Sequence, residues 1–210
     1  MTGRNWRRAL IAGCILTLSG TALAQQTPAP ARVRGQIEKV EGNTLSVKAR
    51  DGAVLAITVP DNVRVTSLLK ASLADIKPNS YIGVTAMPQA DGSQQAIAIH
   101  IFTEAQRGTG EGHRPWDLRP GSTMTNAAVE TTAAGVDGQV LTVKYKSADK
   151  TEEKKVIVPG DAAIVSFQPG DRSELKAGAQ VIIFGIQKQP DGTLTAPSVN
   201  VGRDGVTPPM

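Results

Sequence analysis

The 210-residue sequence predicts an all-β protein built from two tandem copies of one small five-stranded barrel. Three observations predict this fold class. Apolar residues alternate with polar residues over short runs, Gly-containing turns separate these runs, and the whole pattern occurs twice. A period of two residues is typical of strands that bury one face, whereas helices repeat about every 3.6 residues.

The duplication is clearest in the first hairpin of each copy. The segment VEGNTLSVK at residues 40–48 returns as VDGQVLTVK at residues 136–144, and ITVP at 57–60 returns as VIVP at 156–159. The matches keep their order, and the differences in length fall in polar loops. We therefore expect two repeated domains, at residues 33–104 and 127–203. Domains of this size bury only about 60% of their unfolded surface, which favours packing between the copies.

The first copy shows the elements in order. Alternating residues at 33–37, 45–49 and 55–59 predict three strands, separated by turns at residues 41–43 and 51–52. Ser72 to Pro78 predicts one helical turn, with Ser72 as its N-cap and Pro78 ending it. Residues 81–87 and 95–102 then form a closing hairpin. Three strands, a helical turn and two strands is the order of an OB-like Greek-key barrel, with a small antiparallel sandwich as the alternative.

Several of these segments also resemble a known family. GNTLSV at residues 42–47, LADIKP at 73–78 and the Asp91–Gly92 hairpin are similar to the pattern of an exported bacterial domain family of unknown function. The second copy, with SELKAG at residues 173–178, is the closer match, whereas the first has Asn79 where the family favours Gly. The resemblance covers both copies. It implies an OB-like fold and indicates no activity.

The first 24 residues predict a cleaved secretory signal peptide. Three arginines precede the apolar run Ala9–Leu18, and the small-residue motif Ala22–Ala24 follows it. We expect cleavage after Ala24 and a periplasmic mature protein, in preference to lipidation at Cys14, whose preceding apolar run is very short. Residues 25–32 are expected to be a flexible segment, and residues 204–210 a loose C-terminal tail.

Charge and composition narrow the function classes. The sequence has 23 basic and 19 acidic residues, and loss of the three leader arginines leaves 20 against 19. A nucleic-acid partner needs a clustered positive excess, so none is expected. No later run is apolar enough to predict an integral membrane segment. The lone cysteine, Cys14, lies in the leader and offers the mature chain no thiol.

The sequence also lacks the short motifs of common hydrolases. It contains no Gly-x-Ser-x-Gly elbow, no His-Glu-x-x-His and no Gly-rich phosphate loop. We therefore expect a non-enzymatic binding or interaction module without a cofactor. Its partner would be an envelope protein or a small ligand.

The candidate site lies in the predicted inter-domain linker, residues 105–126. A flexible spacer does not need a tryptophan, yet this segment contains Trp116. One hypothesis is that His113, Arg114, Trp116 and Asp117 form a ligand-binding surface. The other is structural: Trp116 and Leu118 pack against a barrel or into the groove between domains.

A metal-handling protein of the copper type is the alternative function. Imidazole and thioether ligands suit Cu(I), and the available residues are Met87, His100, His113, Met124 and Trp116. A two-residue turn at Asp91–Gly92 would place Met87 opposite Ala96 and His100 opposite Gly83, too far apart to share an ion. His100 also alternates out of phase with Ile99 and Ile101, which predicts a surface position. We therefore predict no metal ligand set.

Overall fold

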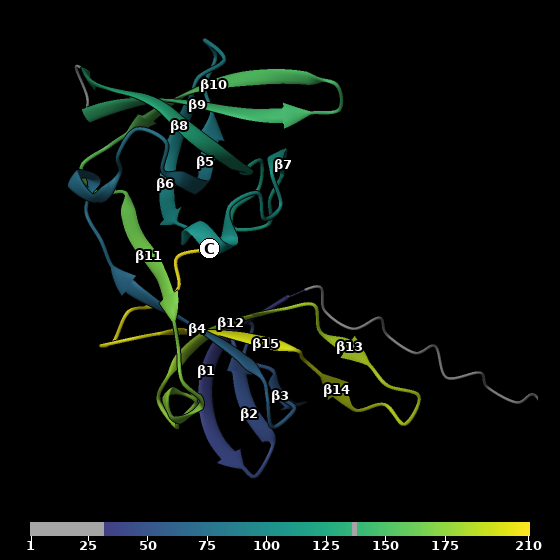
Figure 1. The fold of residues 1–210 in the computed structure, drawn as a ribbon. Coiled ribbons are helices and arrows are strands. Elements are labelled where there is room, and N and C mark those ends of the chain that lie inside the picture. The colour runs from purple at the N-terminus through teal and green to yellow at the C-terminus, as the bar shows by residue number, and fades with distance from the viewer. Residues whose placement is uncertain (1–31, 136–137) are drawn as a thin grey trace, which may run out of the picture.

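The computed structural model describes residues 32–135 and 138–210, which form an all-β fold (Figure 1). Fifteen strands join one continuous sheet, and three short 3₁₀ turns interrupt the connections. In the described residues we find no helix with the length and apolar character needed to cross a membrane. The elements are β1 Arg32–Glu41, β2 Thr44–Ala49, β3 Val54–Thr58, β4 Arg64–Lys70, η1 Leu73–Asp75, β5 Tyr81–Pro88, β6 Gln94–Ile101, η2 Glu104–Gln106, β7 Gly112–Pro115, β8 Thr123–Gly135, β9 Gly138–Ser147, β10 Lys150–Val158, β11 Ala163–Pro169, η3 Arg172–Glu174, β12 Gln180–Phe184, β13 Gln187–Lys188, β14 Leu194–Thr195 and β15 Ser198–Gly202.

Five strands close into a ring that we call barrel B: β5, β6, β8, β9 and β10. Antiparallel pairs join β6 to β5, β5 to β8, β8 to β9 and β9 to β10. The ring closes where the start of β6 runs parallel to β10, with Gln94 opposite Val156. Its interior is mainly aliphatic, as the alternating residues predict. The fully buried members include Ile82, Val84, Ile99, Leu141, Val143 and Val156.

A second group of strands repeats this arrangement and is called barrel A: β1, β2, β3, β12 and the run that contains β14 and β15. The ladder β12–β1–β2–β3 is antiparallel. Residues 194–202 complete the ring, because β14 runs parallel to β3 and β15 pairs with β12. The buried core members described for barrel A are all aliphatic, among them Ile37, Leu45, Ile57, Val181, Ile183 and Val199.

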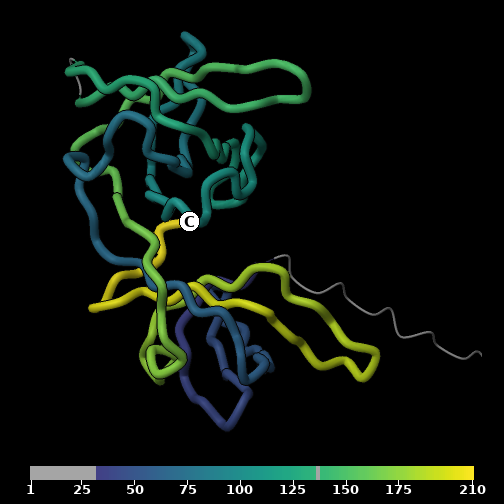
Figure 2. The backbone as a smooth tube through the Cα atoms, in the orientation of Figure 1, coloured from purple at the N-terminus to yellow at the C-terminus, as the bar shows by residue number. Residues whose placement is uncertain are grey.

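The two barrels exchange strands, which departs from the expected tandem arrangement at residues 33–104 and 127–203. Barrel A combines β1–β3 from the first repeat with β12–β15 from the second, and barrel B combines β5–β6 with β8–β10. The chain passes from one barrel to the other after β4 and again after β11 (Figure 2). Because equivalent strands present equivalent faces, pairing within a repeat and pairing between repeats bury the same side chains. Periodicity therefore cannot distinguish them.

The crossing strands β4 and β11 mark an approximate two-fold axis. They pair antiparallel, with Leu68 opposite Phe167. These two residues occupy equivalent positions, because the repeat places Phe167 99 residues after Leu68. Each crossing strand also runs parallel to a strand of its own barrel, β4 to β15 and β11 to β6. The two barrels are thus joined through one sheet.

Two segments outside the repeats differ from expectation. Residues 105–126 do not connect the barrels: they lead from β6 to β8 within barrel B, and they contain β7, which pairs with β8. The C-terminal residues 204–210 are not loose, since Pro208 and Met210 are buried between the barrels. Arg50 donates a hydrogen bond to the carbonyl of Pro208 at 3.2 Å, and Arg34 bonds that of Met210. The predicted leader and residues 25–31 lie outside the described residues.

Candidate functional site

A cavity of about 310 Å³ lies between the two barrels, beside the β4–β11 crossing. Strands of both barrels, the segment after β6 and the C-terminal residue contribute to its wall. Thr109 and Gly110 are exposed and yet line it, so the cavity opens to solvent there. The lining residues are Gly83, His100, Phe102, Gln106, Thr109, Gly110, Arg114, Trp116, Met124, Asn126, Phe167, Phe184, Asn200 and Met210.

His100 lies at the base of this cavity and is only 1% exposed. The expectation of a surface position is wrong, because the Phe167 ring and residues of barrel A cover the outer face of β6. Its ring stacks on Phe167 with centroids 5.7 Å apart. Among the described residues, neither ring nitrogen has a hydrogen-bond partner of ordinary geometry. Burial lowers the pKa of His100 to about 4, and the backbone of Gly83 partly opposes the shift, so the imidazole is neutral near pH 7.

Gly83 makes room beside the histidine. It pairs with His100 on one side and with Asn126 on the other, so these three residues form a row across three strands. A Cβ atom at Gly83 would lie 2.9 Å from Asn126 Oδ1 and 3.1 Å from the Phe102 ring. The Nδ2 group of Asn126 donates to the Thr109 carbonyl at 2.9 Å. Its Oδ1 atom is buried and has no partner among the described residues.

Aromatic side chains form much of the wall. Phe102 and Phe167 contact each other with ring centroids 5.1 Å apart, and Tyr81 contacts Phe102 at 5.4 Å. Phe184 and Trp116 complete the aromatic lining. Of these residues, Phe102, Trp116 and Phe184 are partly exposed. The cavity thus offers flat apolar surfaces that are accessible from outside.

Trp116 is held between arginines. The Arg32 guanidinium lies 3.9 Å from its ring centroid and the Arg114 guanidinium 5.6 Å from it. Backbone contacts with Ser122 fix the residue, since the Trp116 amide donates to the Ser122 carbonyl at 2.8 Å. The indole Nε1 atom is buried and lacks a partner among the described residues. Desolvation lowers the pKa of both arginines, while each keeps its charge.

The structure brings together only two of the four predicted site residues. Arg114 and Trp116 line the cavity. Asp117 points away and binds Arg34 at 2.7 Å, a contact that holds the pKa of the carboxyl below its usual range. His113 lies beside barrel B, where its Nδ1 atom is 2.8 Å from Thr125 Oγ1 and its ring stacks on Tyr145 at 6.4 Å. The hypothesis of one surface made of all four residues is therefore not supported.

The residues considered for a metal ion are also divided. His100, Met124 and Trp116 line the cavity, whereas Met87 contributes to a different pocket. His100 lies opposite Gly83, as predicted, but Met87 lies opposite Gln95 rather than Ala96. A β-bulge after Thr85 shifts the register by one residue. Among the described residues there is no cluster of three or more His, Cys, Asp or Glu side chains.

Sequence reasoning missed most of the cavity, including His100, Asn126 and the three phenylalanines. One signal for it is present in the sequence. Residues 96–102 read AIAIHIF, and such a nearly unbroken apolar run is typical of a strand covered on both faces. That run predicts a second buried face on β6, with His100 and Phe102 in it.

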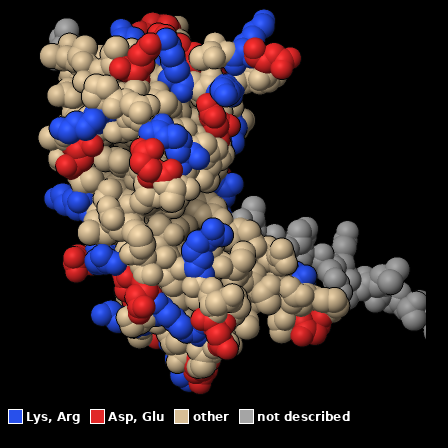
Figure 3. Space-filling model, in the orientation of Figure 1, with Lys and Arg blue, Asp and Glu red and all other residues tan. Residues whose placement is uncertain are grey.

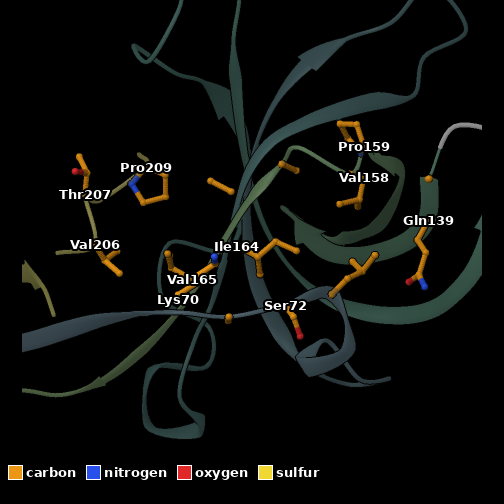
Figure 4. A pocket seen from close by; sticks show the side chains of 16 residues that line it. Lys70, Ser72, Gln139, Val158, Pro159, Ile164, Val165, Val206, Thr207 and Pro209 are labelled. Atoms are coloured by element: carbon orange, nitrogen blue, oxygen red, sulfur yellow. The ribbon is translucent and has the colours of Figure 1, made fainter. Parts of the chain in front are cut away.

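A larger cavity of about 600 Å³ is lined by the end of β4, the start of β11 and C-terminal residues (Figure 4). Its labelled side chains are mostly aliphatic or proline, such as Val158, Ile164 and Pro209. None of the buried polar atoms that lack partners belongs to its lining residues. The smaller cavity is therefore the better candidate for a specific site.

Comparison of the chain with protein-family models, curated proteins and solved structures gives no match. The assignment of a function thus depends on the chemistry of the cavity itself.

Proposed function

We propose that this protein is a non-enzymatic binding module of the cell envelope, and that its ligand occupies the cavity between the barrels. One observation carries the proposal: His100, Trp116 and Asn126 each contain a buried polar atom without a partner among the described residues, and all three residues line the same apolar cavity. Such atoms are rare in folded proteins, because an unmade hydrogen bond in a buried place costs about 1–3 kcal/mol. A ligand that bonds them would recover this free energy.

The composition of the wall favours binding over catalysis. Among the described lining residues, His100 alone has an ordinary pKa near neutral pH, and no carboxylate lines the cavity beside it. A general base needs a suitable pKa and a group that orients it. With its pKa lowered to about 4 by burial, His100 is a weak base and a good neutral hydrogen-bonding group.

The fold and the predicted leader support the wider setting. We infer that both barrels are OB-like, because each has five strands and a 3₁₀ turn follows each crossing strand. The predicted signal peptide would deliver the protein to the periplasm. On the face shown in Figure 3, acidic and basic side chains are mixed over both barrels, which favours a small ligand over a nucleic acid.

Metal handling is the second candidate, and one observation favours it. His100, Met124, Met210 and Trp116 line the same cavity, so imidazole and thioether groups are close to an aromatic face. The positive charge of Arg114 in the lining opposes it. Silver, added as a stable substitute for Cu(I), should bind stoichiometrically and change Trp116 fluorescence if this candidate is right.

A fragment screen tests the main proposal. The full chain carrying Trp6→Phe has Trp116 as its sole tryptophan. We expect several neutral and charged aromatic fragments to bind in ligand-observed NMR and to alter Trp116 emission. Gly83→Ala, whose added methyl group would crowd Asn126 and Phe102 in the cavity wall, should weaken them. Gly160→Ala is the matched control, because nothing lies within 4 Å of its added Cβ. Fragments that bind equally well to all three proteins would refute the site.

A further inference from the structure

The aromatic residues of this chain are concentrated at one place. Aromatic residues make up only 3% of the sequence, yet all three phenylalanines and Trp116 line this cavity. The barrel interiors are mainly aliphatic and show that the fold itself does not require aromatic packing. Rings in a cavity offer flat surfaces on which another ring can stack. This placement favours a planar, aromatic ligand.

The charge at the cavity has one sign. Arg114 is the single charged residue of the lining, and no aspartate or glutamate belongs to it. Its Nη1 atom donates to the Gly110 carbonyl at 2.7 Å, which places the guanidinium at the open mouth. Arg32 lies outside the lining, stacks on Trp116 and is paired with Asp117 at 3.3 Å, so Arg114 is the cation available to a ligand. A guanidinium is a strong donor to carboxylates, so the mouth favours an anionic group and disfavours a metal cation.

The unpartnered atoms add a pattern of polar contacts. The indole N–H of Trp116 is a donor and the Oδ1 atom of Asn126 is an acceptor. Neutral His100, 1% exposed, supplies one donor and one acceptor. Together they can fix the orientation of a ring that carries polar substituents.

We propose that the cavity binds a small planar aromatic molecule that carries a carboxylate, with its ring against the aromatic wall and its anionic group at Arg114. This inference rests on the proposed function and names the chemical class of the ligand. No covalent step is involved.

Three probes of similar size test it by calorimetry on the full chain carrying Trp6→Phe. They are 2-naphthoate, the neutral 2-naphthalenemethanol and the non-aromatic anion decahydro-2-naphthoate. We expect 2-naphthoate to bind about tenfold more tightly than either of the others, because each lacks one of the two matched features. Equal or tighter binding of the neutral or the non-aromatic probe would overturn the proposal.

Two variants locate the anionic contact. Arg114→Gln should remove the preference for 2-naphthoate over 2-naphthalenemethanol, whereas Arg119→Gln, at an exposed residue outside the lining, should preserve it. An unchanged preference in Arg114→Gln would also overturn the proposal. If neutral fragments bind at Trp116 but 2-naphthoate does not, the ligand class is wrong and the binding site remains. If no fragment responds to Gly83→Ala, the proposed function fails as well.

Discussion

The facing sides of the two barrels differ at equivalent positions, although their interiors are alike. Barrel B presents the row His100, Gly83 and Asn126 across three paired strands. Barrel A presents Asn200, Ile182 and Arg34 at the same pairing positions.

This difference shows that the residues inside the barrels and the residues between them have different roles. The aliphatic interiors specify the same barrel twice, so they can be exchanged between repeats without loss of packing. The facing sides are not constrained by that symmetry. Barrel B has a glycine, Gly83, at the position where barrel A has the packed isoleucine Ile182. This difference leaves a cavity on one side of an almost symmetric interface.

The largest expected effect concerns the crossing that joins the barrels. Leu68 is fully buried at the approximate two-fold axis, and we expect Leu68→Ala to lower the free energy of unfolding by about 2–5 kcal/mol. Val54→Ala, at a side chain that is 58% exposed, should change it by less than about 0.5 kcal/mol. Urea denaturation measures both. Because the strands are exchanged, we also expect one cooperative transition, and two separate transitions would contradict the coupling of the barrels.

The next effect tests whether Gly83 makes the barrels different. Gly83→Ile gives barrel B the residue found at position 182 of barrel A. The new side chain would meet Asn126 and Phe102 at once, so we expect a loss of about 1–3 kcal/mol in stability and loss of fragment binding. Urea denaturation and ligand-observed NMR measure the two effects. Retained binding with lower stability would show that the cavity is not the site.

The all-β class and the closed barrel followed from alternation, because an inward face of Val, Leu and Ile repeats every second residue. The exchange of strands between the repeats could not be predicted from this alternation. Leu68 and Phe167 have the same local pattern in both repeats, and only the path of the chain through residues 71–72 and 170–171 decides which barrel each repeat completes.

The site was harder to predict than the fold. A tryptophan in an expected linker is unusual, which indicates Trp116 and its neighbour Arg114 as site residues, and both line the cavity. The alternation of His100 with Ile99 predicts a surface position when one face of the strand is exposed to solvent. A neighbouring barrel buried that face, and one strand pattern carries no information about a neighbour from a distant part of the sequence.

A moderate effect should appear in the pH dependence of stability. The pKa of His100 falls from its ordinary value of 6.5 to about 4 in the folded chain, so the unfolded chain binds more protons between these values. The contribution of neutral His100 to the free energy of unfolding is therefore fully present above pH 6.5 and decreases as the pH falls toward 4. His100→Asn, which copies Asn200 of barrel A, should flatten this slope in urea denaturation. His113→Asn is the control and should retain most of the pH dependence of stability. An unchanged slope in His100→Asn would contradict the burial of a neutral histidine.

The smallest expected effect distinguishes the two 3₁₀ turns that follow the crossing strands, η1 after β4 and η3 after β11. After β11, Glu174 binds Arg203 at 2.8 Å and accepts a hydrogen bond from buried Ser67 at 2.8 Å. The equivalent Asp75 after β4 accepts bonds from Ser72, at the start of its own turn. Arg203 lowers the pKa of Glu174 to about 2, so its contribution is present above the ordinary value of 4.5 and is lost as the pH falls toward 2.

We expect Glu174→Gln to reduce stability near neutral pH by less than about 1 kcal/mol, because the ion pair is partly solvated. The deficit should shrink as the pH approaches 2, where the wild-type carboxyl is itself becoming protonated. Among the described residues Asp75 has no arginine partner, so Asp75→Asn should show a smaller dependence on added salt in the same urea titrations. Equal salt dependence in both variants would mean that the two turns are held by the same local capping contacts, and that Arg203 adds nothing to the asymmetry between the barrels.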